Sequence, residues 1–237
     1  MEKKGHINPN TSVVPNGVNY DAFSTPVSEP ADMCDIPHPR VGYVGKIKTQ
    51  LDIDLLVTLA RRHRYWSFVF VGPKKPLGNE ENSFQELLSM PNVYYLGAKP
   101  LHALPGYVQH MDVCMLPYLR NGYTKFIYPL KLHECLAAGR PVVGSAIRSL
   151  EEFEGVIKLA RMPEEWSSAL TKSLVRDAND PARQEARRAV AREHDWGRLV
   201  ELIVRALCER LGPSYLERYL LRPKPDNGVP TFSPREF

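Results

Sequence analysis

Short apolar runs alternate with longer amphipathic stretches along most of the chain, and glycine or proline bounds many of them. Runs rich in valine and aromatic residues predict buried strands at residues 41–45, 67–72, 93–97, 113–116, 142–143 and 156–159. Helical spacing of apolar residues predicts helices at 51–62, 84–90, 104–110, 129–138, 164–175, 181–192 and 198–211. This alternation indicates an α/β fold, a Rossmann-like, doubly wound parallel sheet of about six strands with helices on both faces.

The predicted strands end in residues that break regular structure. Gly45, Gly72, Gly97 and Pro117 all stand at or just after a carboxyl end. Ligands of open parallel sheets bind beyond these ends. We therefore expect the functional site there.

The stretch 126–143 reads as a loop, a helix, a glycine turn and a strand. Pro129 suits the first helical turn, and Gly139 ends the helix. No serine, threonine, aspartate or asparagine precedes Pro129 closely, so the first N–H groups remain free and form a natural anion site. Lys131 adds a cation, and Glu134 follows on roughly the same face. The pattern fits a nucleoside diphosphate, with phosphates at the helix start and ribose hydroxyls on the carboxylate.

Composition narrows the class of protein. The 237 residues are 43% apolar and 24% charged, which is typical of a globular soluble protein. The net charge of +4 favours an anionic ligand, and no aromatic-basic motif of a nucleic-acid binder is present. Neither a signal peptide nor a membrane-spanning apolar run is evident, so we expect a cytoplasmic protein.

The cysteines do not indicate a metal site. They are far apart and lack metal-ligand spacing, which favours reduced thiols. We expect no metal and no cofactor. The four residues are Cys34, Cys114, Cys135 and Cys208.

The C-terminal part is predicted to be helical and carries two surface features. A basic helix face either contacts an anionic membrane or is simply solvated; its members are Arg183, Arg187, Arg188 and Arg192. After Gly212, an apolar stripe within 215–220 either meets another domain or packs on its own. We divide the chain into a Rossmann-like domain, 1–212, with an irregular segment at 1–39, and a C-terminal helix with a Pro-rich tail, 213–237.

Several motifs together resemble one enzyme family. The run from Pro129 to Val143, P-L-K-L-H-E-C-L-A-A-G-R-P-V-V, is similar to the donor-site signature of GT-B glycosyltransferases of the family 4 type (group 1). Three earlier segments also resemble parts of the same domain, and they occur in the same order as in the family. They are V-V-P-N-G-V from Val13, Gly45-Lys46 and N-V-Y-Y-L-G from Asn92. The resemblance covers the C-terminal, donor-binding domain only, and implies that residues 1–212 form a nucleotide-sugar-binding domain. It implies that an N-terminal acceptor domain is missing, or is supplied by a partner chain.

The resemblance also implies an activity and a set of site residues. The activity is transfer of a sugar from a nucleoside diphosphate sugar to an acceptor hydroxyl, with retention and without a divalent metal. Glu134 would bind the ribose, and Lys131 and Lys46 the diphosphate. No catalytic base is identified. The remaining substrate-binding candidates are Gly45, Leu130, Leu132, Gly97, Lys99 and Tyr123.

Two departures from the family pattern leave alternatives open. Phe126 stands where typical members have a second glutamate that contacts the donor sugar, and Leu51 replaces a later lysine, for which Lys48 or Lys131 compensates. The alternatives are a non-catalytic nucleotide-sugar-binding or interaction module that needs a partner chain, or an epimerase on the GT-B scaffold. The base, the sugar and the acceptor are not specified by the sequence.

Overall fold

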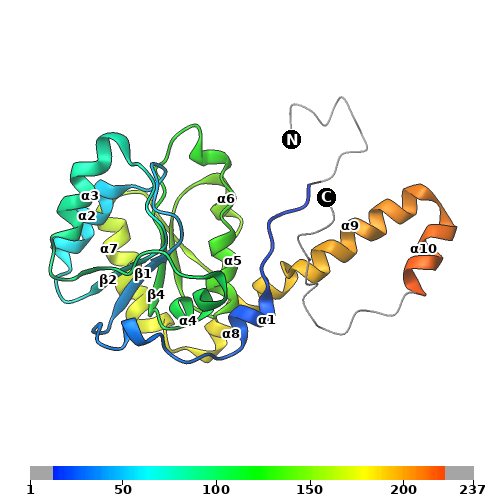
Figure 1. Ribbon diagram of the computed structural model, residues 1–237, viewed down its shortest axis with the longest axis horizontal. Helices are drawn as coiled ribbons and strands as arrows, with labels where there is room; N and C mark the ends of the chain where they lie inside the picture. The colour runs from blue at the N-terminus through cyan, green and yellow to red at the C-terminus, as the bar shows by residue number, and fades with distance from the viewer. Residues whose placement is uncertain (1–12, 222–237) are drawn as a thin grey trace. The chain divides into compact units, whose positions relative to one another are not determined.

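The computed structural model describes residues 13–221 (Figure 1). The chain divides into two compact units, Met1–Leu199 and Val200–Phe237. The expected boundary after residue 212 falls inside the second unit and stays a prediction. The first residues of the expected irregular segment and the Pro-rich tail lie outside the described residues.

A six-stranded parallel sheet forms the centre of the first unit. Its order is β3-β2-β1-β4-β5-β6, with every neighbouring pair parallel. The order reverses between β1 and β4, which is the switch point where such sheets bind ligands. The fold class predicted from the sequence is confirmed. The strands are β1 (Arg40–Val44), β2 (Ser67–Val71), β3 (Val93–Tyr95), β4 (Val113–Leu116), β5 (Val142–Ser145) and β6 (Lys158–Ala160).

Helices cover both faces of this sheet. One layer contains α2, α3 and α7, and the other contains α1, α4, α5 and α8 (Figure 1). The short helices α1 and α6 were not expected from the sequence. The helices are α1 (Tyr20–Ser24), α2 (Ile53–Arg62), α3 (Glu81–Leu88), α4 (Leu104–Gln109), α5 (Leu130–Ala137), α6 (Arg148–Glu151), α7 (Pro163–Lys172), α8 (Pro181–Glu193), α9 (Trp196–Leu211) and α10 (Pro213–Leu220).

The segment around Val18 does not form a regular strand. Val18 makes only a single bridge, to Asp195, at the junction of α8 and α9. Gly17 does not have a positive φ. A Cβ there would instead lie 2.8 Å from the carbonyl oxygen of His194. Glycine is needed at this position for close packing rather than for a turn.

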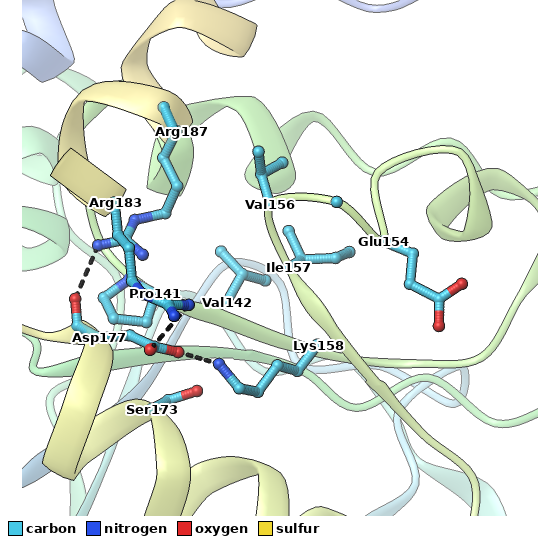
Figure 2. A pocket seen from close by; sticks show the side chains of 12 residues that line it. Pro141, Val142, Glu154, Val156, Ile157, Lys158, Ser173, Asp177, Arg183 and Arg187 are labelled. Carbon is cyan, nitrogen blue, oxygen red and sulfur yellow. Dashed lines mark hydrogen bonds and ion pairs between the residues drawn. The ribbon is translucent and has the colours of Figure 1, made fainter.

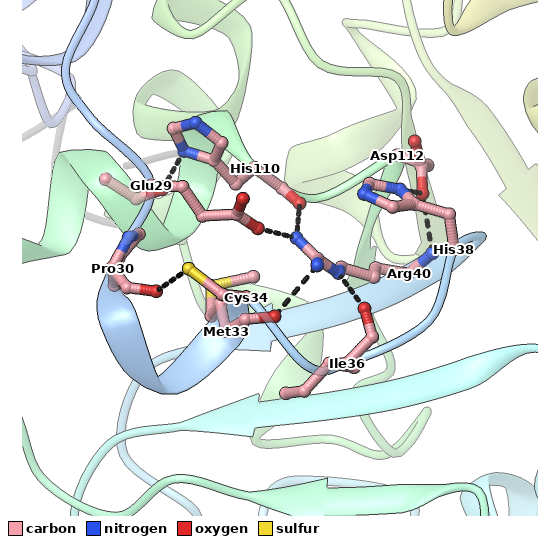
Figure 3. A network of polar contacts seen from close by, with 10 residues as sticks. Glu29, Pro30, Met33, Cys34, Ile36, His38, Arg40, His110 and Asp112 are labelled. Carbon is pink, nitrogen blue, oxygen red and sulfur yellow. Dashed lines mark hydrogen bonds and ion pairs between the residues drawn. The ribbon is translucent and has the colours of Figure 1, made fainter.

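A buried arginine fixes the N-terminal segment against the start of β1. The Arg40 side chain is 3% exposed and pairs with the carboxylate of Glu29. Its guanidinium also donates to the carbonyl oxygens of Ile36 and Met33, both at 2.8 Å (Figure 3). Asp112 accepts the Arg40 backbone N–H from the β4 side. Arg40 therefore joins the segment before β1 to the amino edge of the sheet.

The basic face of α8 is partly internal, because one of its four arginines is buried. Arg187 is buried, and its guanidinium donates to the carbonyl oxygens of Gly139 and Asp177 at 2.8 and 2.9 Å. Arg192 pairs with Glu185 on the same helix. Packing of α8 on α5 thus accounts for Arg187, whereas Arg183 and Arg192 are exposed. Within residues 13–221, no helix is both long and apolar enough to cross a membrane.

Candidate functional site

Three glycines form the carboxyl edge of the sheet on the β1 side. The Gly45 N–H donates to the Val71 carbonyl at 2.7 Å, and the Gly72 N–H donates to the Gly97 carbonyl at 2.7 Å. All three have positive φ values, 154°, 136° and 68°. At the ends of these strands the chain thus turns at residues that have no side chain. This agrees with the glycines that the sequence places at the strand ends.

Helix α5 begins beside this edge without a side-chain cap. Pro129 is the N-cap residue itself, one position earlier than the first-turn position that we expected. The Leu132 N–H is taken by the Pro129 carbonyl at 3.2 Å. The N–H groups of Leu130 and Lys131 therefore remain at the helix start, where the helix dipole favours an anion.

The other end of α5 is fixed by the predicted glycine. Gly139 has φ +74°, and its N–H donates to the Leu136 carbonyl at 2.9 Å. The next N–H, of Arg140, reaches the Cys135 carbonyl at 2.9 Å. These two bonds form a Schellman motif, so the helix stops where β5 must begin.

Lys131 lies directly over the end of β1. A Cβ built on Gly45 would lie 1.6 Å from Lys131 Cε. The ammonium nitrogen is 5.8 Å from the centre of the Tyr43 ring. Burial lowers the pKa of Lys131, the Glu134 carboxylate opposes this, and the charges of Lys48 and Lys46 lower it further. The charges of Glu134, Lys48 and Lys46 therefore act on Lys131 at the switch point.

Glu134 is half-buried and is neither sealed in the core nor remote from this edge. Burial raises the pKa of its carboxyl group, and Lys131 counteracts the shift. Tyr43 and Tyr118 are buried at the ends of β1 and β4, and burial is the main cause of their raised pKa values. The negative charge of Glu134 raises both pKa values further. The charge of Glu134 is thus felt by residues at the ends of the two strands between which the sheet order reverses.

The sequence did not single out Tyr43 as part of this site. Its hydroxyl donates to the Lys46 carbonyl at 3.1 Å, and its ring lies under Lys131. Tyr43 therefore contacts both lysines, Lys46 through its backbone and Lys131 through its side chain. In the sequence it is one more apolar residue of a strand, and only its place just before the Val44-Gly45 strand end marks it. Leu51 is fully buried, which explains why this position carries no cation.

The structure does not bring every predicted residue to this edge. Leu132 is fully buried, so only its backbone faces the helix start. The Lys99 ammonium pairs with Asp32 at 2.6 Å and lies 5.6 Å from the centre of the Tyr107 ring. The ion pair with Asp32 holds Lys99 against the segment before β1. Gly97 is open, since a Cβ there would meet nothing within 4 Å.

Two aromatic side chains of the loop before α5 are exposed to solvent. Tyr123 is 66% and Phe126 is 73% exposed. The N–H groups of Tyr123 and Thr124 both donate to the Asn121 side chain, at 3.0 and 2.9 Å. They are therefore not free donors for a sugar in this conformation. Leu130, at the helix start, is exposed.

No metal site is apparent in the described part of the chain. Residues 13–221 contain no group of three or more histidine, cysteine, aspartate or glutamate side chains arranged to hold an ion. All four cysteines are free thiols, three of them buried.

His133, next to Glu134, has an environment that makes stability depend on pH. Its ring is fully buried, stacks on His194 at 4.1 Å and has Nε2 3.1 Å from the Tyr128 hydroxyl. Nδ1 is buried and has no partner within the described residues. Burial, and secondarily His194, lower the pKa of His133 to about 3.

We expect His133 to make the protein lose stability in mild acid. The folded state keeps the ring neutral, whereas the unfolded chain takes up a proton below the ordinary pKa of 6.5. The stability that the protein has with a neutral His133 ring is therefore fully present above pH 6.5 and is lost as the pH falls toward 3. Between pH 7 and pH 5 the wild type should lose about 2 kcal/mol more than His133→Phe. Urea unfolding at both pH values measures this, and equal losses in the two proteins would contradict the assignment.

Comparison with known proteins identifies the family. The family described as "Glycosyl transferases group 1" matches residues 38–176, more than half of the chain. The chain therefore belongs to the group 1 glycosyltransferases, as the resemblance indicated.

One curated relative is similar to this chain in sequence. A Bacillus subtilis (strain 168) protein, TuaH, which is assigned to teichuronic acid biosynthesis as a glycosyltransferase, is 34% identical over 200 residues. The match covers 81% of this chain and 49% of TuaH. The chain thus spans about half the length of that relative.

Solved structures share the fold at low sequence identity. HepE of Anabaena superposes with a TM-score of 0.64 at 16% identity, covering 83% of this chain and 56% of HepE. The trehalose-6-phosphate synthase OtsA gives a TM-score of 0.66 at 15% identity, covering 83% of this chain and 51% of OtsA. Both again match this chain over about half of their length.

Proposed function

We propose that this chain is the donor-binding half of a glycosyltransferase that moves a sugar from a nucleoside diphosphate sugar to an acceptor hydroxyl. One observation carries the proposal: Lys131 lies across Gly45 at the switch point, with the Glu134 carboxylate one helical turn away. Lys46 and Lys48 add two further positive charges close by. Two phosphates match this excess of cations, and a ribose diol matches the carboxylate.

The same arrangement supplies a physical mechanism. When the bond between the sugar and the diphosphate breaks, negative charge grows on the leaving phosphate. Fixed N–H groups at the start of α5 and the ammonium groups of Lys131 and Lys46 stabilise that charge without reorganising. Retention and independence of a divalent metal belong to the proposal through the family resemblance. The acceptor would be bound by a further domain or a partner chain, in line with the half-length match to TuaH and HepE.

A ligand screen tests the proposal directly. HepE was crystallised with UDP and glucose, so UDP-sugars come first, followed by GDP-, ADP- and dTDP-sugars. A ligand at a hundred times its Kd stabilises the folded state by about 2.7 kcal/mol, which raises the melting temperature measurably. Hydrolysis and transfer assays, with and without an N-terminal half, then separate an enzyme from a binding module. Absence of any shift across the four nucleotide classes would contradict the proposal.

Gly45→Ala is expected to weaken nucleotide-sugar binding although it removes no charge. The new Cβ would occupy the position of Lys131 Cε, so the lysine must leave the end of β1. We expect an affinity loss of about tenfold, similar to losing one charge-assisted hydrogen bond. Calorimetry would measure it. Gly155→Ala, where a Cβ meets nothing within 4 Å, is the matched control.

A double-mutant cycle tests the reason for this loss. If Gly45→Ala acts by displacing Lys131, the double variant with Lys131→Ala should bind only slightly more weakly than Lys131→Ala alone. Full additivity of the two losses would show that Gly45 acts in another way.

A further inference from the structure

A cavity lies at the amino edge of the sheet, opposite the edge that carries Lys131 and Glu134. It has a volume of about 260 Å³ and is bounded by the starts of β5 and β6, the π-helical turn Ser173–Asp177 after α7, and α8 (Figure 2). Lys131 and Glu134 lie at the carboxyl edge, so this cavity is separate from the proposed donor site.

The cavity wall carries more positive than negative charge. The buried Asp177 carboxylate lies between Lys158 and Arg183, which both pair with it (Figure 2). Arg187 donates only to carbonyl oxygens in its assigned hydrogen bonds, at Gly139 and Asp177. Three cations therefore surround one carboxylate. Figure 2 shows the exposed Glu154 side chain directed away from this group.

These cations repel one another in a partly dehydrated place. Burial lowers the pKa of Arg187 to about 10, and the nearby charges of Arg140 and Arg183 add to the shift. Burial also lowers the pKa of Lys158, with further contributions from Arg183 and Arg187. An anion in the cavity would reduce this repulsion.

The cavity also presents a polar group without a partner among residues 13–221. The Ser173 hydroxyl lines it, is fully buried, and makes no hydrogen bond to any described residue. Buried polar groups are rarely left unsatisfied, so an unpaired hydroxyl in a cavity indicates a bound partner.

We propose that this cavity binds a phosphate-type oxyanion, either free phosphate or the phosphate of a small ester. Two guanidinium groups, an ammonium group and a hydroxyl approach from different sides, which suits an anion with several oxygens. The volume lies just below the range of drug-sized ligand pockets, so the ligand is small. The site would act independently of donor binding.

Calorimetric titration with inorganic phosphate tests the proposal. The wild type should show a phosphate site that Lys131→Ala retains, because that variant affects only the donor site. Arg183→Gln and Ser173→Ala should each weaken this site by about tenfold. The control is Arg192→Gln, which removes an exposed arginine of the same helix that pairs with Glu185, and it should bind phosphate normally.

Ser173→Ala keeps the test valid if the other variant misfolds, and methyl phosphate distinguishes the two sources of the phosphate. Ser173→Ala removes a hydroxyl that has no partner in the described part of the chain. This variant should therefore fold even if Arg183→Gln, checked by its melting temperature, does not. Methyl phosphate that competes with phosphate indicates an ester ligand, whereas failure to compete indicates free phosphate. Unchanged binding in both cavity variants, or phosphate binding lost only in Lys131→Ala, would overturn the proposal.

Discussion

Replacement of Glu134 by alanine is expected to weaken binding of the nucleoside diphosphate sugar by about 1–3 kcal/mol, roughly fivefold to more than a hundredfold. In the proposed complex the carboxylate accepts hydrogen bonds from both ribose hydroxyls, and alanine accepts none. The half-buried position of Glu134 makes each such bond stronger than one in water. Calorimetry with the sugar nucleotide selected by the ligand screen measures the loss.

A deoxyribose analogue shows whether the ribose is the group that Glu134 binds. The wild type should bind the analogue more weakly than the parent nucleotide, while Glu134→Ala should bind the two about equally. If the analogue bound more weakly than the parent nucleotide by the same factor in both proteins, the Glu134 carboxylate would not contact the ribose. Glu134→Gln, which keeps the shape and one acceptor, should fall between wild type and alanine.

Arg40→Met is expected to lower the free energy of unfolding by about 3–5 kcal/mol. The change keeps most of the apolar stem but removes the guanidinium that pairs with Glu29 and donates to the carbonyls of Met33 and Ile36 (Figure 3). These acceptors would remain in a poorly hydrated place without their donor, which is costly. Urea unfolding at pH 7 measures the effect.

An exposed arginine provides the control for this prediction. Arg198 is 54% exposed and pairs with Glu193, so Arg198→Met should cost less than about 1 kcal/mol. A loss of similar size for both variants would show that burial of Arg40 does not determine its contribution.

Local sequence patterns fixed the order and kind of most elements in this protein. The valine-rich runs became six strands, and Gly139 ended α5 through two hydrogen bonds within neighbouring residues. Such features depend on periodicity and on backbone preferences over a few positions, both of which are visible in the sequence. The uncapped start of α5 was predictable for the same reason. The family was evident from motif order, because spacing along the chain is a property of sequence.

Tertiary packing decided which of the candidate residues meet. It placed Lys131 over Gly45 and Tyr43, engaged Lys99 with Asp32, and turned Arg187 inward against Gly139. Each of these contacts joins residues from different elements, and their distance depends on how helices settle on the sheet. Periodicity gives the face of a helix but not the neighbour that this face will touch, so the sequence determined the elements and the packed layers determined the site.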